Sequence, residues 1–107
     1  YLVRWKDTTS VIEIKDIYYI EAANLHLTVH TAKSSVECVG RIVQEEKKLV
    51  GYNIVKCHRS YMINLCHVKQ IDNTKVLLTN GKQIPVSKAY KDTVKVSFNN
   101  YLLGCSV

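Results

Sequence analysis

The stretch from residue 57 to residue 67, Cys-His-Arg-Ser-Tyr-Met-Ile-Asn-Leu-Cys-His, decides the fold of this chain. Its apolar alternation predicts a strand that turns into a second strand, and this turn would lift Arg59 out of a packed sheet onto the surface. An arginine held on a rigid element is suited to forked hydrogen bonding with a base edge or a phosphate. Nucleic acid is therefore the first partner to consider.

Short strands are predicted on both sides of this stretch, because β-branched and aromatic residues alternate there with polar ones. The expected strands are residues 11–14, 17–20, 25–30, 35–39, 54–57, 60–63, 68–71, 75–79 and 83–86. Residues 22–24 would connect the second and third of them and leave Leu25 and His26 at a strand entrance. Asn80-Gly81 is the strongest hairpin signal, because both residues tolerate positive φ.

In two other segments, apolar residues recur at helical spacing. The first predicted helix begins at about Arg41 and ends at Gly51, because glycine commonly terminates helices. Its inward face is expected to hold Ile42, Val43, Glu46, Leu49 and Val50, and its solvent face Glu45, Lys47 and Lys48. The second would begin with Ser87 as N-cap, although residues 93–98 also fit a strand. The expected fold is mainly β, with one short internal helix and a C-terminal helix.

Length and composition set the class of protein. With 107 residues the chain is expected to form a single domain over 1–107, and its 47% hydrophobic content fits a folded globule. No apolar run approaches the roughly 20 residues of a membrane helix, so we expect a soluble domain. Tyr1-Leu2-Val3 has no signal-peptide layout, and we expect the chain to be a fragment of a longer protein.

The formal charge of +6 is distributed unevenly. Residues 1–53 hold seven bases and seven acids, whereas residues 54–107 hold eight bases and two acids. The whole excess therefore lies in the half that contains Arg59. Such one-sided charge is expected of a polyanion binder, and a solubilising surface is the alternative.

The sequence gives little support for a catalytic site or a metal site. The dipeptides Cys57-His58 and Cys66-His67 lack zinc-site spacing, and neighbours on a strand point to opposite faces. No pattern places a base beside a nucleophile, and no glycine-rich phosphate loop occurs. The four cysteines are expected to be reduced thiols. We expect no enzyme activity, no metal and no cofactor.

Basic residues near strand ends are the remaining candidates. His26, Arg59 and Lys88 are placed to contact bases, which specify sequence, whereas contacts to phosphates set register. Phosphate contacts are assigned to Lys33, Lys69, Lys75, Lys82 and Lys91.

Three ordered motifs add a family resemblance. Residues 16–22 read DIYYIEA, residues 58–64 read HRSYMIN, and residues 80–88 read NGKQIPVSK. They resemble, in order and spacing, the signatures of the LytTR domain, the DNA-binding effector domain at the C-terminus of many bacterial response regulators. The resemblance covers roughly residues 4–102.

The resemblance implies an elongated fold of about ten short strands that binds double-stranded DNA through loops. Carried over by position, the base-reading residues are Leu25 and His26 in the first loop, Arg59 in the second and Lys88 in the third. Ser87, Tyr90 and Lys91 would be backbone contacts. Many relatives have arginine at the position of Lys88. Lysine lacks the planar fork, which implies looser base specificity there.

The family's biology implies a cytoplasmic transcription regulator of a two-component system, with an upstream receiver domain and a possible homodimer on promoter direct repeats. Three alternatives stay open. A non-specific RNA- or polyanion-binding β module would also use the charge asymmetry, and a protein-interaction domain would use a basic surface only for solubility. A redox role for Cys57 beside Arg59 is a further hypothesis, because nearby positive charge favours thiolate.

Overall fold

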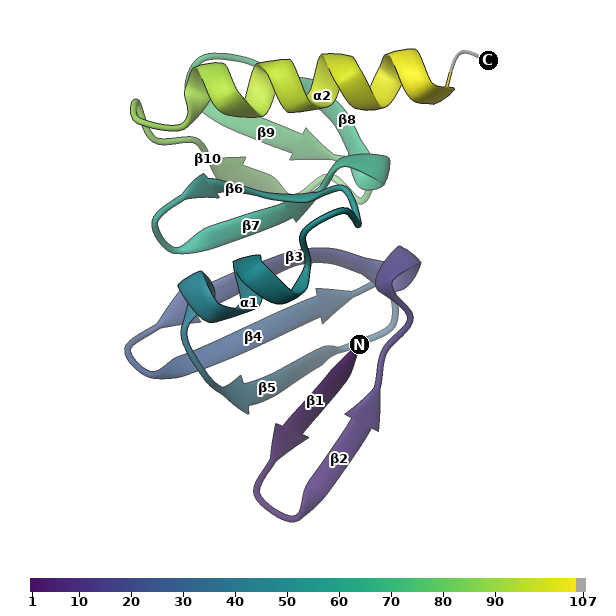
Figure 1. Cartoon of the computed structure of the whole chain (residues 1–107), viewed down its shortest axis with the longest axis vertical. Coiled ribbons are helices and arrows are strands. Elements are labelled where there is room, and N and C mark those ends of the chain that lie inside the picture. The colour runs from purple at the N-terminus through teal and green to yellow at the C-terminus, as the bar shows by residue number, and fades with distance from the viewer. Residues whose placement is uncertain (106–107) are drawn as a thin grey trace.

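The computed structural model describes residues 1–105, which form ten strands, two α-helices and two short 3₁₀ turns (Figure 1). The elements in chain order are β1 (Leu2–Trp5), β2 (Thr8–Val11), η1 (Ile14–Asp16), β3 (Ile17–Ala23), β4 (His26–Thr31), β5 (Ser35–Val39), α1 (Ile42–Lys48), β6 (Ile54–His58), β7 (Tyr61–Asn64), η2 (Leu65–His67), β8 (Val68–Ile71), β9 (Lys75–Leu78), β10 (Gln83–Pro85) and α2 (Lys91–Cys105). The mainly β fold with an internal and a C-terminal helix is confirmed.

The strands form three antiparallel sheets that follow one another along the long axis of the domain (Figure 1). The central sheet has the order β5-β4-β3-β7-β6. The β10-β9-β8 sheet and α2 lie at one end, and the β1–β2 hairpin lies at the other. The Cα positions extend over 41 × 30 × 26 Å, so the domain is elongated.

The central strands β3 and β7 are buried on both faces. Ile20 and Met62 belong to one core cluster, which also contains residues of α1. Tyr19 and Ile63 belong to a second cluster, which lies against the three-stranded sheet and α2. Because both faces are covered, these strands are mostly apolar, with Glu21 in β3 and Asn64 in β7 as exceptions, and each fully buried apolar side chain contributes about 1.5–3 kcal/mol.

Asn64 is a buried polar residue at the end of β7. Its Nδ2 donates to the carbonyl oxygens of Ile14 (3.1 Å) and Ile17 (2.9 Å), and its Oδ1 accepts from the amide of Cys66 at 3.2 Å. The side chain thus replaces water for three backbone groups. It joins η1 to η2 across the end of the central sheet.

Two boundaries differ from the sequence prediction. The strand predicted over 11–14 is wrong beyond Val11, because β2 ends there and η1 begins at Ile14. The connection predicted over 22–24 is also displaced, because β3 continues to Ala23, which pairs with His26. The turn is Asn24-Leu25, and Asn24 accepts its positive φ of 58° because asparagine tolerates the left-handed region.

The prediction for the faces of α1 is partly wrong. Glu45 is buried, whereas Val43 and Val50 are exposed. The hydroxyl of Tyr1 donates to Oε2 of Glu45, and Lys48 Nζ donates to its Oε1 at 3.3 Å. Burial and this carboxylate raise the pKa of the Tyr1 hydroxyl. The hydroxyl of Tyr1, the residue before β1, therefore satisfies this carboxylate and allows a charged residue inside the core.

The C-terminal helix begins later than Ser87. The carbonyl of Ser87 accepts from the amides of Tyr90 and Lys91 at 3.0 and 3.1 Å, while α2 starts at Lys91 and includes residues 93–98. The Oγ of Ser87 is buried and has no hydrogen-bond partner among the described residues, so the predicted side-chain cap is wrong. Within 1–105, no helix combines the length and apolar character needed to cross a membrane.

The Asn80-Gly81 hairpin is confirmed, with one difference in backbone conformation. Gly81 has a φ of 90°, whereas Asn80 does not need the left-handed region. The side chain of Asn80 instead accepts from the amide of Lys82 at 3.0 Å. A four-residue loop, 79–82, therefore connects β9 to β10.

Candidate nucleic-acid interface

Three turns lie along one long edge of the domain, which we call the three-turn edge (Figure 1). They are the β3–β4 turn with His26 after it (24–26), the β6–β7 turn (59–60) and the β10–α2 connection (86–90). The three loop positions carried over from the family motifs all fall on this edge. The structure thus brings together residues that are more than 60 positions apart in the sequence.

Backbone hydrogen bonds tie the middle turn to both of its neighbours. The amide of Ala22, at the end of β3, donates to the carbonyl of Ser60 at 2.8 Å. The amide of Ser87 donates to the carbonyl of Cys57 at 3.0 Å. These bonds have ordinary geometry and do not consume any side chain. The spacing of the three turns is therefore set by the main chain of the β6–β7 hairpin.

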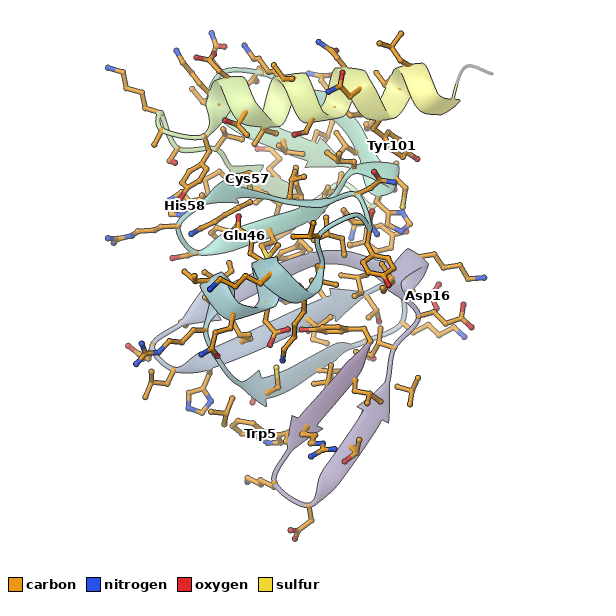
Figure 2. The ribbon with its side chains drawn as sticks, in the orientation of Figure 1. Trp5, Asp16, Glu46, Cys57, His58 and Tyr101 are labelled. Carbon is orange, nitrogen blue, oxygen red and sulfur yellow. The ribbon has the colours of Figure 1, made fainter. Side chains whose placement is uncertain are left out.

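The middle turn leaves Arg59 exposed. Nδ1 of His58 accepts from the amide of Ser60 at 3.1 Å, and this bond closes the turn around Arg59. The His58 ring also packs edge-on against Tyr61, with centroids 5.5 Å apart. Figure 2 shows His58 at the edge. Since the turn is held without Arg59, its guanidinium is available to a ligand.

Cys57 lies inside the domain beneath this turn (Figure 2). Its Sγ contacts the carbonyl oxygens of Pro85 and Tyr61 at 3.6 and 3.8 Å. Burial raises the pKa of its thiol to about 12. A protonated, buried thiol is a poor nucleophile. The redox hypothesis for Cys57 is therefore wrong, because the thiol is neither accessible to solvent nor ionised near neutral pH.

The first turn carries Leu25, which is 56% exposed, and His26, which begins β4. The ring of His26 packs edge-on against Trp5 of β1, with centroids 5.1 Å apart. Lys6 Nζ lies 5.8 Å from the Trp5 ring centroid, at cation–π distance. Sequence reasoning missed Trp5, because the β1–β2 hairpin reaches His26 only in three dimensions.

The third turn places Lys88 in solvent immediately before α2. Tyr90 is partly buried, and Lys56 Nζ lies 5.4 Å from its ring centroid. Lys75 begins β9 and pairs with Pro85, so it lies beside this turn. Lys91 follows as the first residue of α2.

The other three predicted phosphate contacts lie elsewhere. Lys33 is in the β4–β5 turn, at the opposite end of β4 from His26. Lys82 is in the β9–β10 loop, where the amide of Thr79 donates to the carbonyl of His67, and Lys69 follows η2 closely. These residues lie on or toward the far edge, which we define by the turns at 31–34 and 79–82 together with η1 and η2 (Figure 1). Their role in DNA binding stays a prediction.

The second Cys-His dipeptide is used structurally. Nε2 of His67 lies 2.6 Å from the carbonyl oxygen of Lys15, and its ring stacks on Tyr18 with centroids 4.0 Å apart. Among residues 1–104, whose side chains the structure describes, no three His, Cys, Asp or Glu gather closely enough to hold a metal ion.

Comparisons with known proteins identify a family and related proteins for this chain. The family model of the LytTr DNA-binding domain matches residues 7–99. The sensory transduction protein LytT of Enterococcus faecalis is 28% identical over 93 residues, which are 82% of this chain and 38% of that protein. The transcriptional regulatory protein LytR of Staphylococcus aureus is 28% identical over 96 residues, covering 85% of this chain and 39% of that protein.

A solved LytTr DNA-binding domain from Bacillus cereus has the same fold. Its TM-score is 0.76 at 22% identity, and the match covers 91% of this chain and 94% of that one. The chain thus spans nearly the whole of a solved domain, but less than half the length of the curated relatives it matches.

Proposed function

The chain belongs to the LytTR family of DNA-binding domains, and from this premise we propose that it binds double-stranded DNA sequence-specifically through the three-turn edge. The family predicted from the three motifs is confirmed. The observation that carries the proposal is the set of exposed side chains, Leu25, Arg59 and Lys88, on turns whose spacing is fixed by backbone bonds. We propose binding without catalysis.

The dimensions of the domain support contact with two successive major grooves. On one face of B-DNA these grooves repeat about every 34–36 Å, and the whole domain, with α2 and the β1–β2 hairpin beyond the outer turns, extends over 41 Å. The three turns follow this axis, so the first and third can face different grooves (Figure 1). We propose that Arg59 contacts a guanine edge, while the apolar Leu25 contacts a thymine methyl group.

Other residues of the edge would complete the contact. We propose His26 and Lys88 as further base contacts, and Lys75, Tyr90 and Lys91 as contacts to the sugar-phosphate backbone. Ser87 can contribute through its main chain, because its Oγ is buried. A duplex lying against this edge is on the other side of the domain from Lys33 and Lys82.

The proposal extends to the longer protein from which such a domain comes. We propose that the domain is the output module of a cytoplasmic transcription regulator, that a receiver domain precedes it, and that two copies bind promoter direct repeats. The names of the matched relatives, sensory transduction and transcriptional regulatory proteins, support this role.

The deciding experiment compares specific with non-specific binding. A preferred duplex is first selected from a random pool with the 107-residue chain, and its affinity is then measured beside a scrambled duplex over a salt series. We expect the selected duplex to bind at least about 10³-fold more tightly at physiological salt, with a linear decrease of log affinity against log salt for both. Equal affinity for both duplexes would refute sequence-specific binding.

Non-specific binding to RNA or another polyanion is the second candidate, because eight bases face only two acids in residues 54–107. Competition of the duplex with single-stranded RNA and DNA of the same length separates the two. Preference for the single strand would favour the second candidate, since single-strand binders use stacking on aromatic platforms.

A further inference from the structure

A hollow of about 260 Å³ lies between the first and middle turns of the three-turn edge. Three segments surround it: the end of β3 with its turn, the β6–β7 turn, and the beginning of α1. Its lining residues include Arg41 and Arg59 on separate segments, with Leu25, Ile42 and Val43 as an apolar wall. No aspartate or glutamate among the described residues lines it. The hollow is therefore lined by two arginines without a carboxylate, which suits it to a compact anion.

Arg41 is placed by the fold and not by any bond of its own side chain. It precedes α1 in extended conformation, with φ −124° and ψ 139°, and its side chain does not cap the helix. Among the side chains that the structure describes, those of residues 1–104, no carboxylate forms an ion pair with Arg41 or Arg59. The nearest acid along the helix, Glu45, already accepts from Tyr1 and Lys48. The guanidinium of Arg41 is thus exposed and not neutralised.

The backbone around the hollow is fixed as well. The amide of Gly40 donates to the carbonyl of Leu25 at 3.0 Å, which holds the segment before Arg41 against the first turn. The amide of Ala22 donates to the carbonyl of Ser60, which holds the middle turn on the other side. A Cβ at Gly40 would approach Leu27 Cδ1 to 3.2 Å, so the glycine permits this close approach. The hollow is consequently a preformed part of the edge.

We propose that this hollow receives one backbone phosphate of the bound DNA, held by Arg41, between the bases contacted by the first and middle turns. The inference rests on the proposed function, because it assumes that DNA lies against the three-turn edge. A guanidinium donates two parallel hydrogen bonds to a phosphate, and Arg59 on the opposite wall adds positive potential. Such a contact adds affinity and sets register, but it does not read sequence.

The first test is the variant Arg41→Ala, measured on the selected and the scrambled duplex. We expect a loss of affinity of about tenfold on both and a decrease of about 0.9 in the salt slope, since one phosphate contact disappears. Arg41→Lys should recover part of the loss. The matched control is Lys47→Ala, which removes an exposed cation of the same helix outside the hollow. Equal losses in Arg41→Ala and Lys47→Ala would overturn the inference.

The second test locates the phosphate. Duplexes carrying a single uncharged methylphosphonate are scanned across the selected site. We expect one linkage between the two contacted bases to weaken the wild-type domain about tenfold and to leave Arg41→Ala unaffected. If every linkage affects both proteins equally, the inference fails. If Arg41→Ala changes base preference instead, Arg41 contacts a base and the phosphate assignment is wrong.

These outcomes separate the inference from the proposed function. Loss of discrimination between selected and scrambled duplexes in the wild type refutes the proposed function. The effect of Arg41 is measured on both duplexes, so it is obtained in either case. Thermal unfolding of Arg41→Ala confirms that the variant is folded, as expected for an exposed side chain.

Discussion

The two long edges of the domain both contain backbone hydrogen bonds, but they differ in how much side chains add to them. At the far edge, side chains join the segments: Asn64 bonds the carbonyls of Ile14 and Ile17, and His67 bonds that of Lys15. At the three-turn edge, the bonds between neighbouring turns run from backbone amide to backbone carbonyl. Among side chains, His58 acts within its own turn, and the buried Cys57 Sγ contacts the carbonyl of Pro85 beneath the edge.

This difference explains which side chains remain available. Where side chains hold the structure, substituting them removes bonds to buried backbone groups. Where the main chain holds it, side chains such as Arg59 and Lys88 are exposed and can change without loss of stability. If recognition lies at the three-turn edge, as proposed, it is separated from the side chains that stabilise the far edge, and four predictions test the separation.

The largest effect is expected for Asn64→Ala at the far edge. It removes one donor each from the carbonyls of Ile14 and Ile17 and the acceptor for the amide of Cys66, so the free energy of unfolding should fall by about 2–4 kcal/mol in urea denaturation. Asn99→Ala, an exposed asparagine on α2, is the control and should change stability by less than about 0.5 kcal/mol. The ratio of selected to scrambled DNA binding should be unchanged in folded Asn64→Ala. A loss below about 1 kcal/mol would contradict the role of Asn64.

The converse is expected for Arg59→Ala. Its stability should change by no more than about 0.5 kcal/mol, whereas binding to the selected duplex should lose about 1–3 kcal/mol and preference at one base pair. Lys33→Ala removes the same charge at the far edge and should have a much smaller effect in the same titration. Retained base preference in Arg59→Ala would remove this residue from the base-reading set.

The third prediction concerns the buried thiol of Cys57 beneath the three-turn edge, whose role in stability is tested by the pH dependence of unfolding. Because its folded pKa is raised to about 12, the folded state keeps the proton longer than the unfolded state. The contribution of this thiol to stability should be fully present below about pH 9. Above that pH, the free energy of unfolding should fall by up to about 1.4 kcal/mol per pH unit. Urea unfolding from pH 8 to 10 should show a shallower decrease for Cys57→Ala than for wild type. Parallel curves for Cys57→Ala and wild type would contradict the assignment.

The smallest effect is expected for Trp5→Ala. Loss of the ring contact frees His26, so discrimination at the base pair contacted by the first turn should fall by about three- to tenfold. Trp5→Phe should retain most of it, since an edge-on ring contact is still possible. Discrimination at the base pair contacted by Arg59 serves as the internal reference. If both base pairs lose discrimination equally, Trp5 acts on the fold and not on His26.

Much of the fold could be predicted from the sequence, because periodicity and turn residues are local signals. The strands at 35–39 and 68–71, and the Asn80-Gly81 hairpin, are found as predicted. The face of α1 could not be predicted, because the buried Glu45 accepts a hydrogen bond from Tyr1, which is 44 residues away in the sequence. The start of α2 was misplaced because the hydroxyl of Ser87 turns inward instead of capping the helix.

The candidate site shows the same limit. Leu25, His26, Arg59 and Lys88 could be proposed from motifs, and the structure places all four along one edge. Charge alone also suggested Lys33, Lys69 and Lys82, since a sum of charges does not say on which edge a lysine lies. Arg41 and Trp5 carried no motif, and only the packing of β1 and α1 beside the first turn brings them to the edge.

The backbone bonds on either side of the β6–β7 hairpin have a consequence for how new specificities can arise. Exposed side chains at three positions can vary independently, so a related domain can acquire a different preferred sequence by single substitutions that leave its folding intact. The distance between the proposed base contacts cannot vary in this way, because it depends on main-chain bonds that every residue type except proline can donate. Target sites within such a lineage should therefore diverge in their bases and keep a constant length.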